Sequence, residues 1–116
     1  MPTIYHIASA SDWHAARAAN AAYTVSTRGR SLAEVGFIHA SDAAQVAPVA
    51  NAFYAGDEGL VVLAIDTAHL TSELKYEPVP GSDAPFPHIY GPLDLDAVTA
   101  VLPLSTGPDG TFRFPA

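Results

Sequence analysis

The alternation of apolar and polar positions predicts a series of short strands. Thr3–Ser9 is rich in β-branched and aromatic residues and ends in a cluster of small residues, so we expect a first strand there. Leu60–Asp66 is almost entirely apolar, which predicts a central strand buried on both faces. Further extended segments are expected at residues 21–26, 36–40, 74–79, 88–90, 97–104 and 111–114.

Two other segments favour helices. Residues 12–20 are Ala-rich and follow Ser11, which we predict to be the N-cap. Residues 42–54 are predicted to form a second helix, with Ser41 as N-cap and a kink or delayed start caused by Pro48. A single helical turn is expected at Leu32–Val35, and residues 27–31 and 80–85 read as loops. The expected class is therefore α+β, with roughly six to eight short, mostly antiparallel strands and two main helices.

Length and composition limit the kind of protein. A chain of 116 residues fits one domain, 1–116, with its own core. No apolar run approaches the ~20 residues that span a bilayer, and the N-terminus lacks the pattern of a signal peptide. The absence of cysteine excludes disulfides, thiolate catalysis and zinc–sulfur sites. We therefore expect a cytoplasmic protein without a membrane segment.

The net charge of −7 bears on partners. Only five Lys and Arg residues accompany twelve Asp and Glu residues. Because non-specific affinity for nucleic acid comes from basic groups that neutralise phosphates, nucleic acid is not an expected partner. A small molecule is the better candidate, and the sequence fixes no oligomeric state.

Three histidines in apolar surroundings are the main chemical signal. His6, His39 and His88 each lie in a segment predicted to be buried, and Glu77 has a similar setting. A single histidine of this kind is most often a core residue that donates to a backbone carbonyl. Because burial of titratable groups costs free energy unless a site satisfies them, the four together favour a polar pocket. We predict Glu77, His6 and His39 as candidate catalytic residues.

Other residues are candidates for ligand binding. Ser41 follows His39 at a predicted helix N-terminus, where anions bind, although its N-cap role is the simpler interpretation. Gln45 lies one turn later on the same face. Arg28 and Arg30 flank a glycine in a predicted loop that could hold a phosphate or carboxylate group, or could be a solvated basic loop. His88 and Tyr90 lie in a segment stiffened by flanking prolines, which would fix their directions.

Six sequence strings carry a resemblance to a known family. They are Ile4-Tyr5-His6-Ile7, Gly36-Phe37-Ile38-His39-Ala40-Ser41, Gln45, Phe53-Tyr54-Ala55-Gly56, Leu74-Lys75-Tyr76-Glu77 and Phe86-Pro87-His88-Ile89-Tyr90-Gly91-Pro92-Leu93. The chain resembles a family of small bacterial proteins known as domain of unknown function 952. The resemblance implies an ADP-ribosyltransferase-like fold, in which two small, mostly antiparallel sheets form a cleft that binds NAD.

The same resemblance suggests roles for individual residues. By position, His6 looks like the histidine on the first strand of ADP-ribosyltransferases, Ser41 like their middle hydroxyl residue, and Glu77 like their late glutamate. Enzymes of that group that modify Arg or Asn side chains have Glu or Gln two residues before the glutamate. Lys75 stands there, so modification of protein side chains is not expected.

Three functional hypotheses remain open. The first is a His- and Glu-lined pocket that binds NAD or a related nucleotide, with transfer or hydrolysis of an ADP-ribosyl or phosphoribosyl group as its chemistry. The second is a divalent-metal site made from His6, His39, His88 and Glu77. The third is a non-enzymatic module that binds a small ligand.

Overall fold

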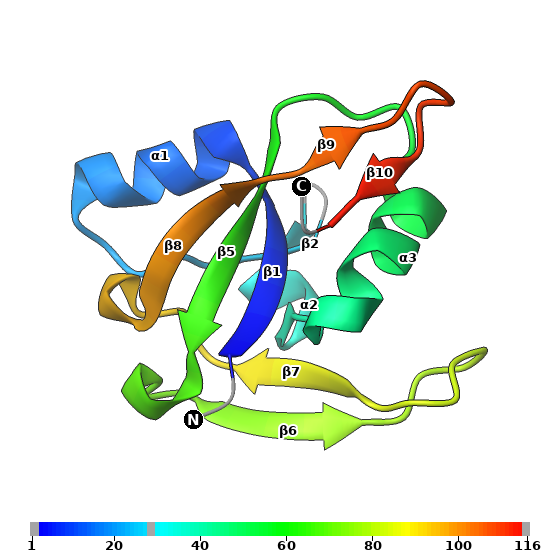
Figure 1. Ribbon diagram of the computed structural model, residues 1–116. Coiled ribbons are helices and arrows are strands. Elements are labelled where there is room, and N and C mark those ends of the chain that lie inside the picture. Colours follow the sequence, from blue (N-terminus) through cyan, green and yellow to red (C-terminus); the bar gives the residue numbers. More distant parts are fainter. Residues whose placement is uncertain (1–2, 28–29, 115–116) are drawn as a thin grey trace.

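The first of two three-stranded sheets has the most apolar strand at its centre. Strand β5 (Leu60–Asp66) lies between β1 (Thr3–Ser9) and β8 (Val98–Pro103), and both pairings are antiparallel. The computed structural model describes residues 3–27 and 30–114. In Figure 1 the three strands stand side by side in the middle of the molecule. The predictions of strands at Thr3–Ser9 and Leu60–Asp66 are confirmed to the residue.

The second three-stranded sheet runs across one end of the first (Figure 1). Its central strand β7 (Phe86–Tyr90) pairs antiparallel with β4 (Ile38–His39) and β6 (Glu73–Glu77). Because side chains alternate along a strand, the second sheet turns one set of residues inward and the other outward. The inward set packs on the first sheet, and the shared core includes Ile4, Ile38, Leu63, Ile65 and Ile89.

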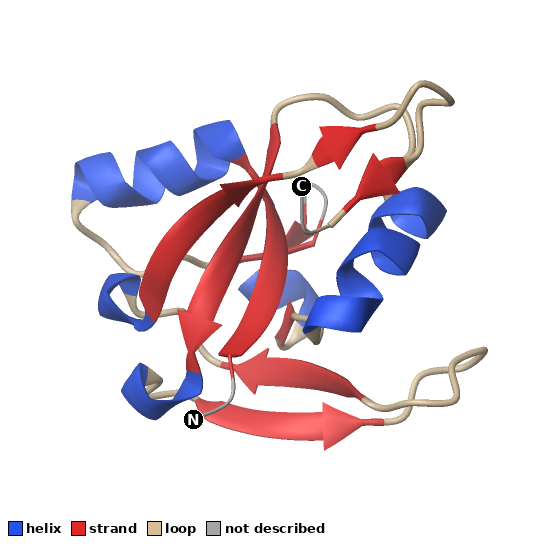
Figure 2. Ribbon diagram, in the orientation of Figure 1, coloured by secondary structure: helices blue, strands red, loops and turns tan. Residues whose placement is uncertain are grey.

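Helices and two short strand pairs complete the fold (Figure 2). The helices are α1 (Ala10–Ala19), α2 (Leu32–Val35) and α3 (Ala43–Phe53), with 3₁₀ turns at Thr67–His69 and Leu95–Ala97. The short pairs join β2 (Val25–Thr27) to β3 (Arg30–Ser31) and β9 (Ser105–Thr106) to β10 (Phe112–Arg113). No helix within residues 3–27 and 30–114 is long and apolar enough to cross a membrane. The coarse prediction, a mixture of antiparallel sheets with two main helices, is confirmed.

The N-caps of both main helices differ from the predicted ones, by two residues in α1 and by one residue in α3. The N-cap of α1 is Ser9 rather than Ser11, and its hydroxyl accepts a hydrogen bond from the Asp12 amide at 3.4 Å. The N-cap of α3 is Asp42 rather than Ser41. Ser41 is held in extended form because its backbone exchanges two hydrogen bonds with Tyr5, of 2.8 and 2.7 Å. Tertiary pairing with β1 therefore overrides the local capping preference.

Two further expectations differ from the structure. Pro48 does not delay α3, which starts at Ala43 and continues through it. Proline removes one backbone donor, and the carbonyl that loses its partner belongs to the exposed Ala44, where water can replace the bond. The predicted loop at residues 27–31 includes β3, whose Arg30 pairs with Thr27.

Pro87 explains how the chain passes from one sheet to the other. The Ala40 amide donates to the Pro87 carbonyl at 3.0 Å, but proline has no N–H to return the bond. The ladder between β4 and β7 therefore ends here. The next residue, Ser41, pairs with Tyr5 of β1 instead. One short segment thus belongs to both sheets and fixes their relative position.

Gly91 is expected to be intolerant of a side chain. A Cβ atom there would lie 2.8 Å from the Cβ of Ser72, whose hydroxyl donates to the Pro92 carbonyl at 2.7 Å. Gly91→Ala should therefore lower the free energy of unfolding by about 1–3 kcal/mol, as overpacking does. Urea denaturation followed by the fluorescence of the buried Trp13 measures this. Addition of Ser72→Gly should recover only the steric part of the loss, because the φ of 157° at Gly91 strains any side chain there. A loss below about 0.5 kcal/mol for Gly91→Ala would contradict the explanation.

Candidate functional site

Two histidines meet on the outward face of the second sheet. His39 of β4 lies directly opposite His88 of β7, and their ring centroids are 5.2 Å apart. The main-chain groups of His39 point away from β7, so the two residues form a pair without mutual backbone hydrogen bonds, the arrangement in which opposing side chains are closest. Strand register therefore brings together two residues that are far apart in sequence.

Glu77 anchors one of these rings. Nδ1 of His88 lies 2.7 Å from Oε1 of Glu77, and the Tyr90 hydroxyl donates to the same oxygen. These two hydrogen bonds, from Tyr90 and then from His88, lower the pKa of the Glu77 carboxyl, and the bond to Glu77 raises the pKa of Tyr90. Glu77 is therefore an ionised carboxylate at neutral pH. Sequence reasoning placed all three residues in one site, and the structure brings them together.

Aromatic rings surround the histidine pair. Phe37 stacks on His88 with centroids 4.0 Å apart and an interplanar angle of 20°, and Phe86 stacks on His39 at 5.3 Å. Burial, and secondarily the nearby His88, lowers the pKa of His39 to about 4. His39 is therefore a neutral ring at physiological pH, able to stack and to exchange hydrogen bonds without adding charge.

Two hollows meet at these residues. One, of about 410 Å³, is lined by Phe37, His39, Val79, His88 and Tyr90 together with Glu77 and two prolines. The other, of about 290 Å³, extends from the same Phe37, His39 and Val79 towards α3 and β2. We call the two together the His39 groove. Each part lies near or within the usual size range of small-molecule pockets, and most of the lining is apolar.

The far end of the His39 groove is built from α3 and β2. Val49, Phe53 and Tyr54 line it from the helix side, and Ser26 and Thr27 line it from the strand. Thr27 and Tyr54 exchange a hydrogen bond of 3.0 Å through their hydroxyl groups. The sequence pattern did not single out these residues or Val79 as part of a site, although alternation did place Phe37 on the face of His39.

His6 does not belong to this groove. It is 2% exposed, its Nδ1 lies 2.6 Å from the carbonyl oxygen of His39, and its Nε2 lies 3.1 Å from the Tyr23 hydroxyl. The carbonyl can only accept, so Nδ1 donates and Nε2 accepts from Tyr23. Burial lowers the pKa of His6 to about 4, against a smaller opposing effect of its backbone hydrogen bond. Both ring nitrogens are satisfied within the core.

The expectation that three histidines share one pocket is therefore wrong for His6. It contacts the backbone of His39 from the inner side of the strand, whereas the His39 ring faces outward. His6 lines a separate hollow of about 170 Å³ with Tyr23, Tyr54 and Asp57 among its walls. Face alternation in β1 correctly predicted a buried side chain, but only the packing of the sheets decides which cavity it meets.

The alternative metal site is not formed. Within residues 3–27 and 30–114, no three His, Asp or Glu side chains are placed to hold one metal ion. Of the four proposed ligands, His6 uses both ring nitrogens elsewhere, and Nδ1 of His88 is bound to Glu77. The hypothesis fails because these donors do not converge on one point.

The remaining candidates lie outside the centre of the groove. Ser41 is 3% exposed and links the sheets through its backbone. Gln45 accepts from the Asp42 amide at 2.8 Å and donates to the Pro85 carbonyl at 3.1 Å, so its amide closes the start of α3 and holds the loop that precedes β7. Arg30 is exposed on β3, next to Thr27 of the groove, and Arg28 lies outside the described residues.

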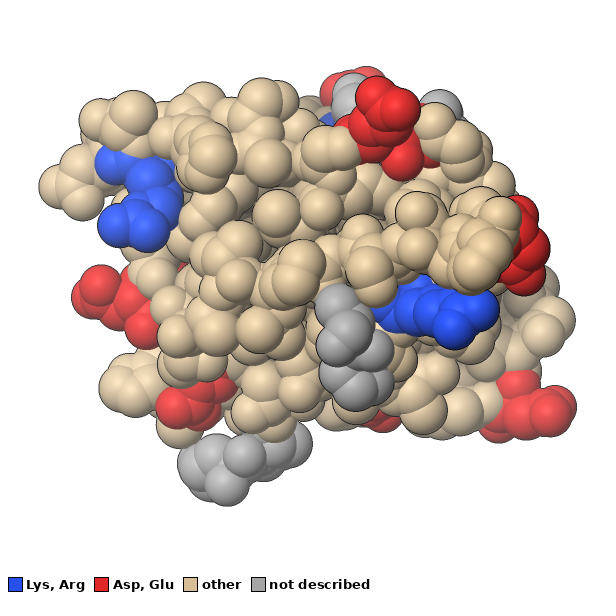
Figure 3. Space-filling model, turned by 45° about the horizontal axis from the view of Figure 1, so that its top comes forward, with Lys and Arg blue, Asp and Glu red and all other residues tan. Residues whose placement is uncertain are grey.

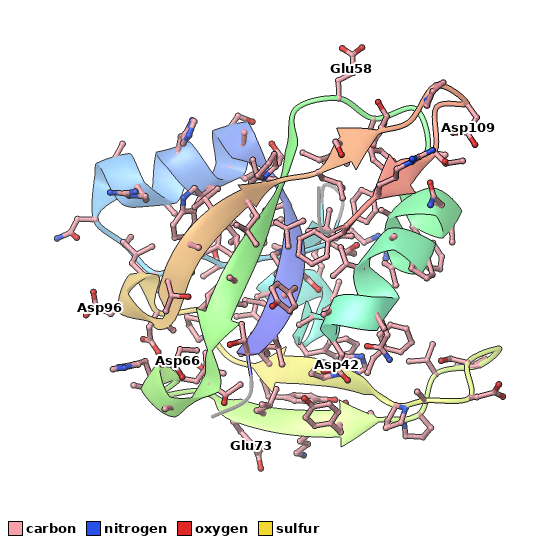
Figure 4. The ribbon with its side chains drawn as sticks, viewed as in Figure 1. Asp42, Glu58, Asp66, Glu73, Asp96 and Asp109 are labelled. Atoms are coloured by element: carbon pink, nitrogen blue, oxygen red, sulfur yellow. The ribbon has the colours of Figure 1, made fainter. Side chains whose placement is uncertain are left out.

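Negative charge is distributed around the molecule. Figure 4 labels six acidic residues that come from different elements: Glu58, Glu73, Asp96 and Asp109 lie at the outline of the view, and Asp42 lies between α3 and the second sheet. On the face drawn in Figure 3, uncharged residues predominate, and charged groups stand at separate points. Neither hollow of the His39 groove has a Lys or Arg in its lining, and Glu77 is the acidic residue there. The groove is thus a small site with one acidic residue in its lining, and it does not belong to a broad charged surface.

Comparison with known proteins identifies relatives of the whole chain. The model of the family described as "Protein of unknown function (DUF952)" matches residues 7–101, a segment that contains His39, Glu77 and His88. The chain belongs to this family. No curated protein matches the sequence significantly. The resemblance to domain of unknown function 952 is therefore confirmed.

Solved structures extend the family comparison to the fold. The crystal structure of CC0527 from Caulobacter crescentus has a TM-score of 0.81 and 33% identity, covering 96% of this chain and 93% of that chain. The solution NMR structure of CC0527 gives a TM-score of 0.75 and 34% identity, with 96% and 91% covered. The mixed α/β arrangement of this DUF952 chain is thus similar to that of a structurally characterised protein over almost its full length.

The burial of His6 predicts a specific loss of stability in acid. An unfolded histidine takes up a proton near pH 6.5, whereas the folded one does so only near pH 4. Between these values the unfolded state binds more protons, so the free energy of unfolding falls as pH falls. His6 alone should account for about 3 kcal/mol of that decrease.

His6→Gln tests this contribution by urea denaturation at several pH values between 7 and 4. The variant should be less stable than the parent at pH 7, because it loses two satisfied hydrogen bonds. Its stability should nevertheless depend less steeply on pH in this window. His14→Gln, an exposed position on α1, is the matched control and should retain the parental dependence. Parallel curves for His6→Gln and the parent would refute the buried neutral state.

Proposed function

We propose that the His39 groove binds NAD or a related nucleotide. The observation that carries this proposal is an ionised Glu77, bonded to His88 and Tyr90, at one end of an otherwise apolar and aromatic groove. A nucleotide has matching parts, namely a flat base for aromatic walls and ribose hydroxyl groups for a carboxylate. Pockets with few polar groups in apolar walls orient their ligands in this way.

Stacking supports placement of the base. The neutral His39 ring and the ring of Phe37 line both hollows, and Phe86 stacks on His39 from the hollow towards α3. Aromatic side chains stack on bases without strong sequence preference, at about 1–3 kcal/mol per base. The wall towards α3, with Val49 and Phe53, continues this apolar surface.

The phosphate groups would lie towards the hairpin formed by β2 and β3. The lining of the groove lacks Lys and Arg, but Thr27 at its far end pairs with Arg30. A guanidinium group binds phosphate oxygens through paired hydrogen bonds. Arg30 is therefore the basic residue on this hairpin for the role, and Arg28, which lies outside the described residues, stays a sequence-based candidate. At the other end of the groove, Lys75 places its Nζ 4.9 Å from the centroid of the Tyr90 ring.

The fold supports the same interpretation. We infer an ADP-ribosyltransferase-like arrangement from two small antiparallel sheets that are joined through β4, with Glu77 at the end of a late strand. In hydrolysis of NAD, a water oxygen bonds to C1′ of the ribose while the C1′–N bond breaks, and its electron pair leaves with nicotinamide. The water proton passes to a base, for which His39 is the candidate. Glu77 stabilises the positive charge that develops on the ribose.

NAD binding is the first measurement. NAD at about one hundred times its Kd should raise the free energy of unfolding by about 2.7 kcal/mol, which a thermal shift and calorimetric titration both detect. Failure of NAD and of related nucleotides to stabilise the protein would refute the proposal and favour another small ligand.

Glu77→Gln separates binding from turnover. If the parent protein releases nicotinamide from NAD, the variant should lose that release while its Kd for NAD stays within about tenfold, or about 1.4 kcal/mol. Glu73→Gln is the matched control, because this exposed carboxylate on the same strand lies outside the lining of the groove. Binding by a parent that releases no nicotinamide would identify a non-enzymatic binding module.

A further inference from the structure

One ring nitrogen in the groove has no protein partner. Nε2 of His88 is buried and receives no hydrogen bond from the described residues, and His88 as a whole is only 5% exposed. Buried polar atoms in native proteins are nearly always hydrogen-bonded, because an unpaired one has lost its bonds to water. An exception inside a candidate ligand site therefore calls for a function.

Glu77 fixes which nitrogen of His88 donates. A carboxylate oxygen accepts hydrogen bonds only, so Nδ1 of His88 must donate across the 2.7 Å contact. The Tyr90 hydroxyl donates to the same oxygen and holds the carboxylate in place. In a neutral imidazole whose Nδ1 carries the hydrogen, Nε2 carries the lone pair. A His88 ring in this neutral form therefore presents an acceptor and not a donor at Nε2.

The contact with Glu77 limits the direction in which this nitrogen points. Glu77 lies on β6, on one side of β7, and His39 lies on β4, on the other side. Nδ1 contacts Glu77, and Nε2 lies on the other side of Cε1, so Nε2 is not directed at that carboxylate oxygen. His88 and His39 both line the hollow of about 410 Å³, so the ring that carries Nε2 borders this part of the groove.

Phe37 covers this position. Its ring stacks on that of His88, and its carbonyl accepts a hydrogen bond from Ser26, which ties the backbone of this segment to β2. The side chain itself is half-buried, and the preceding Gly36 has a φ of 98° with no heavy atom close to where a Cβ would be. The backbone of this segment is held against β2, and the phenyl group lies over the His88 ring, so Phe37 is placed to act as its cover.

We propose that Nε2 of His88 is the acceptor for a hydroxyl or N–H group of the ligand, with Glu77 as its positioning residue and Phe37 as its cover. The ligand class follows from the surroundings, namely a flat ring with an uncharged donor group attached. An anionic group is disfavoured at this point, because it would meet a lone pair beside the ionised Glu77. The inference deepens the proposed function, since it names what the bound molecule must offer, but it does not require that molecule to be NAD.

The tautomer of His88 tests the acceptor without any ligand. Long-range ¹H–¹⁵N correlation spectra at pH 7 should show His88 with a protonated Nδ1 and an unprotonated Nε2. Glu77→Gln should change this pattern towards a mixture of tautomers, and Glu73→Gln should leave it as in the parent. A parent His88 that carries its proton on Nε2, or on both nitrogens, would overturn the proposal.

Phenol and toluene test the ligand class. They share the flat ring and differ in a hydroxyl or methyl group, so phenol should bind several-fold more tightly and move the ¹⁵N resonance of His88 Nε2. Equal binding without that shift overturns the inference even if NAD binds. A shift with phenol upholds the inference even if NAD fails, which separates its outcome from that of the proposed function.

Diethyl pyrocarbonate tests the cover, because it modifies unprotonated imidazole nitrogens. His88 in the parent should react slowly, and Phe37→Ala should increase its rate at least several-fold. Phe53→Ala is the matched control, since this ring lines the other part of the groove and is 65% exposed. Equal rates in the parent and in Phe37→Ala would refute the role of Phe37.

Discussion

The hydrogen bond from His6 to the carbonyl oxygen of His39 holds the architecture together. It crosses from the first sheet to a strand of the second, beside the two backbone bonds between Tyr5 and Ser41. Because a buried imidazole needs partners for both nitrogens, this contact and the bond to Tyr23 can form only when β1 and β4 lie in one relative position. The outward direction of the His39 ring, and so the floor of the groove, depends on that position.

The groove combines two environments that proteins usually keep apart. Its walls are aromatic and aliphatic, yet one end contains an ionised Glu77 bonded to a buried histidine. Low polarity around such a pair strengthens each remaining electrostatic interaction, and it makes an unpaired acceptor such as Nε2 of His88 costly. A site of this kind gains most from a ligand that brings one donor and a flat apolar surface, which is the common basis of both proposals.

Membership of DUF952 and the similarity to CC0527 show that this chain shares its fold with other proteins. A shared fold does not identify the chemistry of the site, which has to be inferred from the residues that form it. In this chain the chemistry is concentrated on one face of a three-stranded sheet, where β4, β6 and β7 each contribute a polar side chain. Regular strands hold such groups more rigidly than loops do, so the directions of His39, His88 and Glu77 are set before any ligand arrives.

The sequence by itself determined the strands at Thr3–Ser9 and Leu60–Asp66, the two main helices and the burial of His6 and His88, because periodicity and local composition act over a few residues. It also indicated that Glu77, His88 and Tyr90 belong together. Only the tertiary structure decided that the His6 side chain lies in the core while the His39 ring lines the groove. It also decided that Ser41 pairs with Tyr5 and so joins the two sheets instead of capping a helix. Those outcomes depend on which strand pairs with which and on the missing N–H of Pro87, and such long-range pairing has no local signal in the chain.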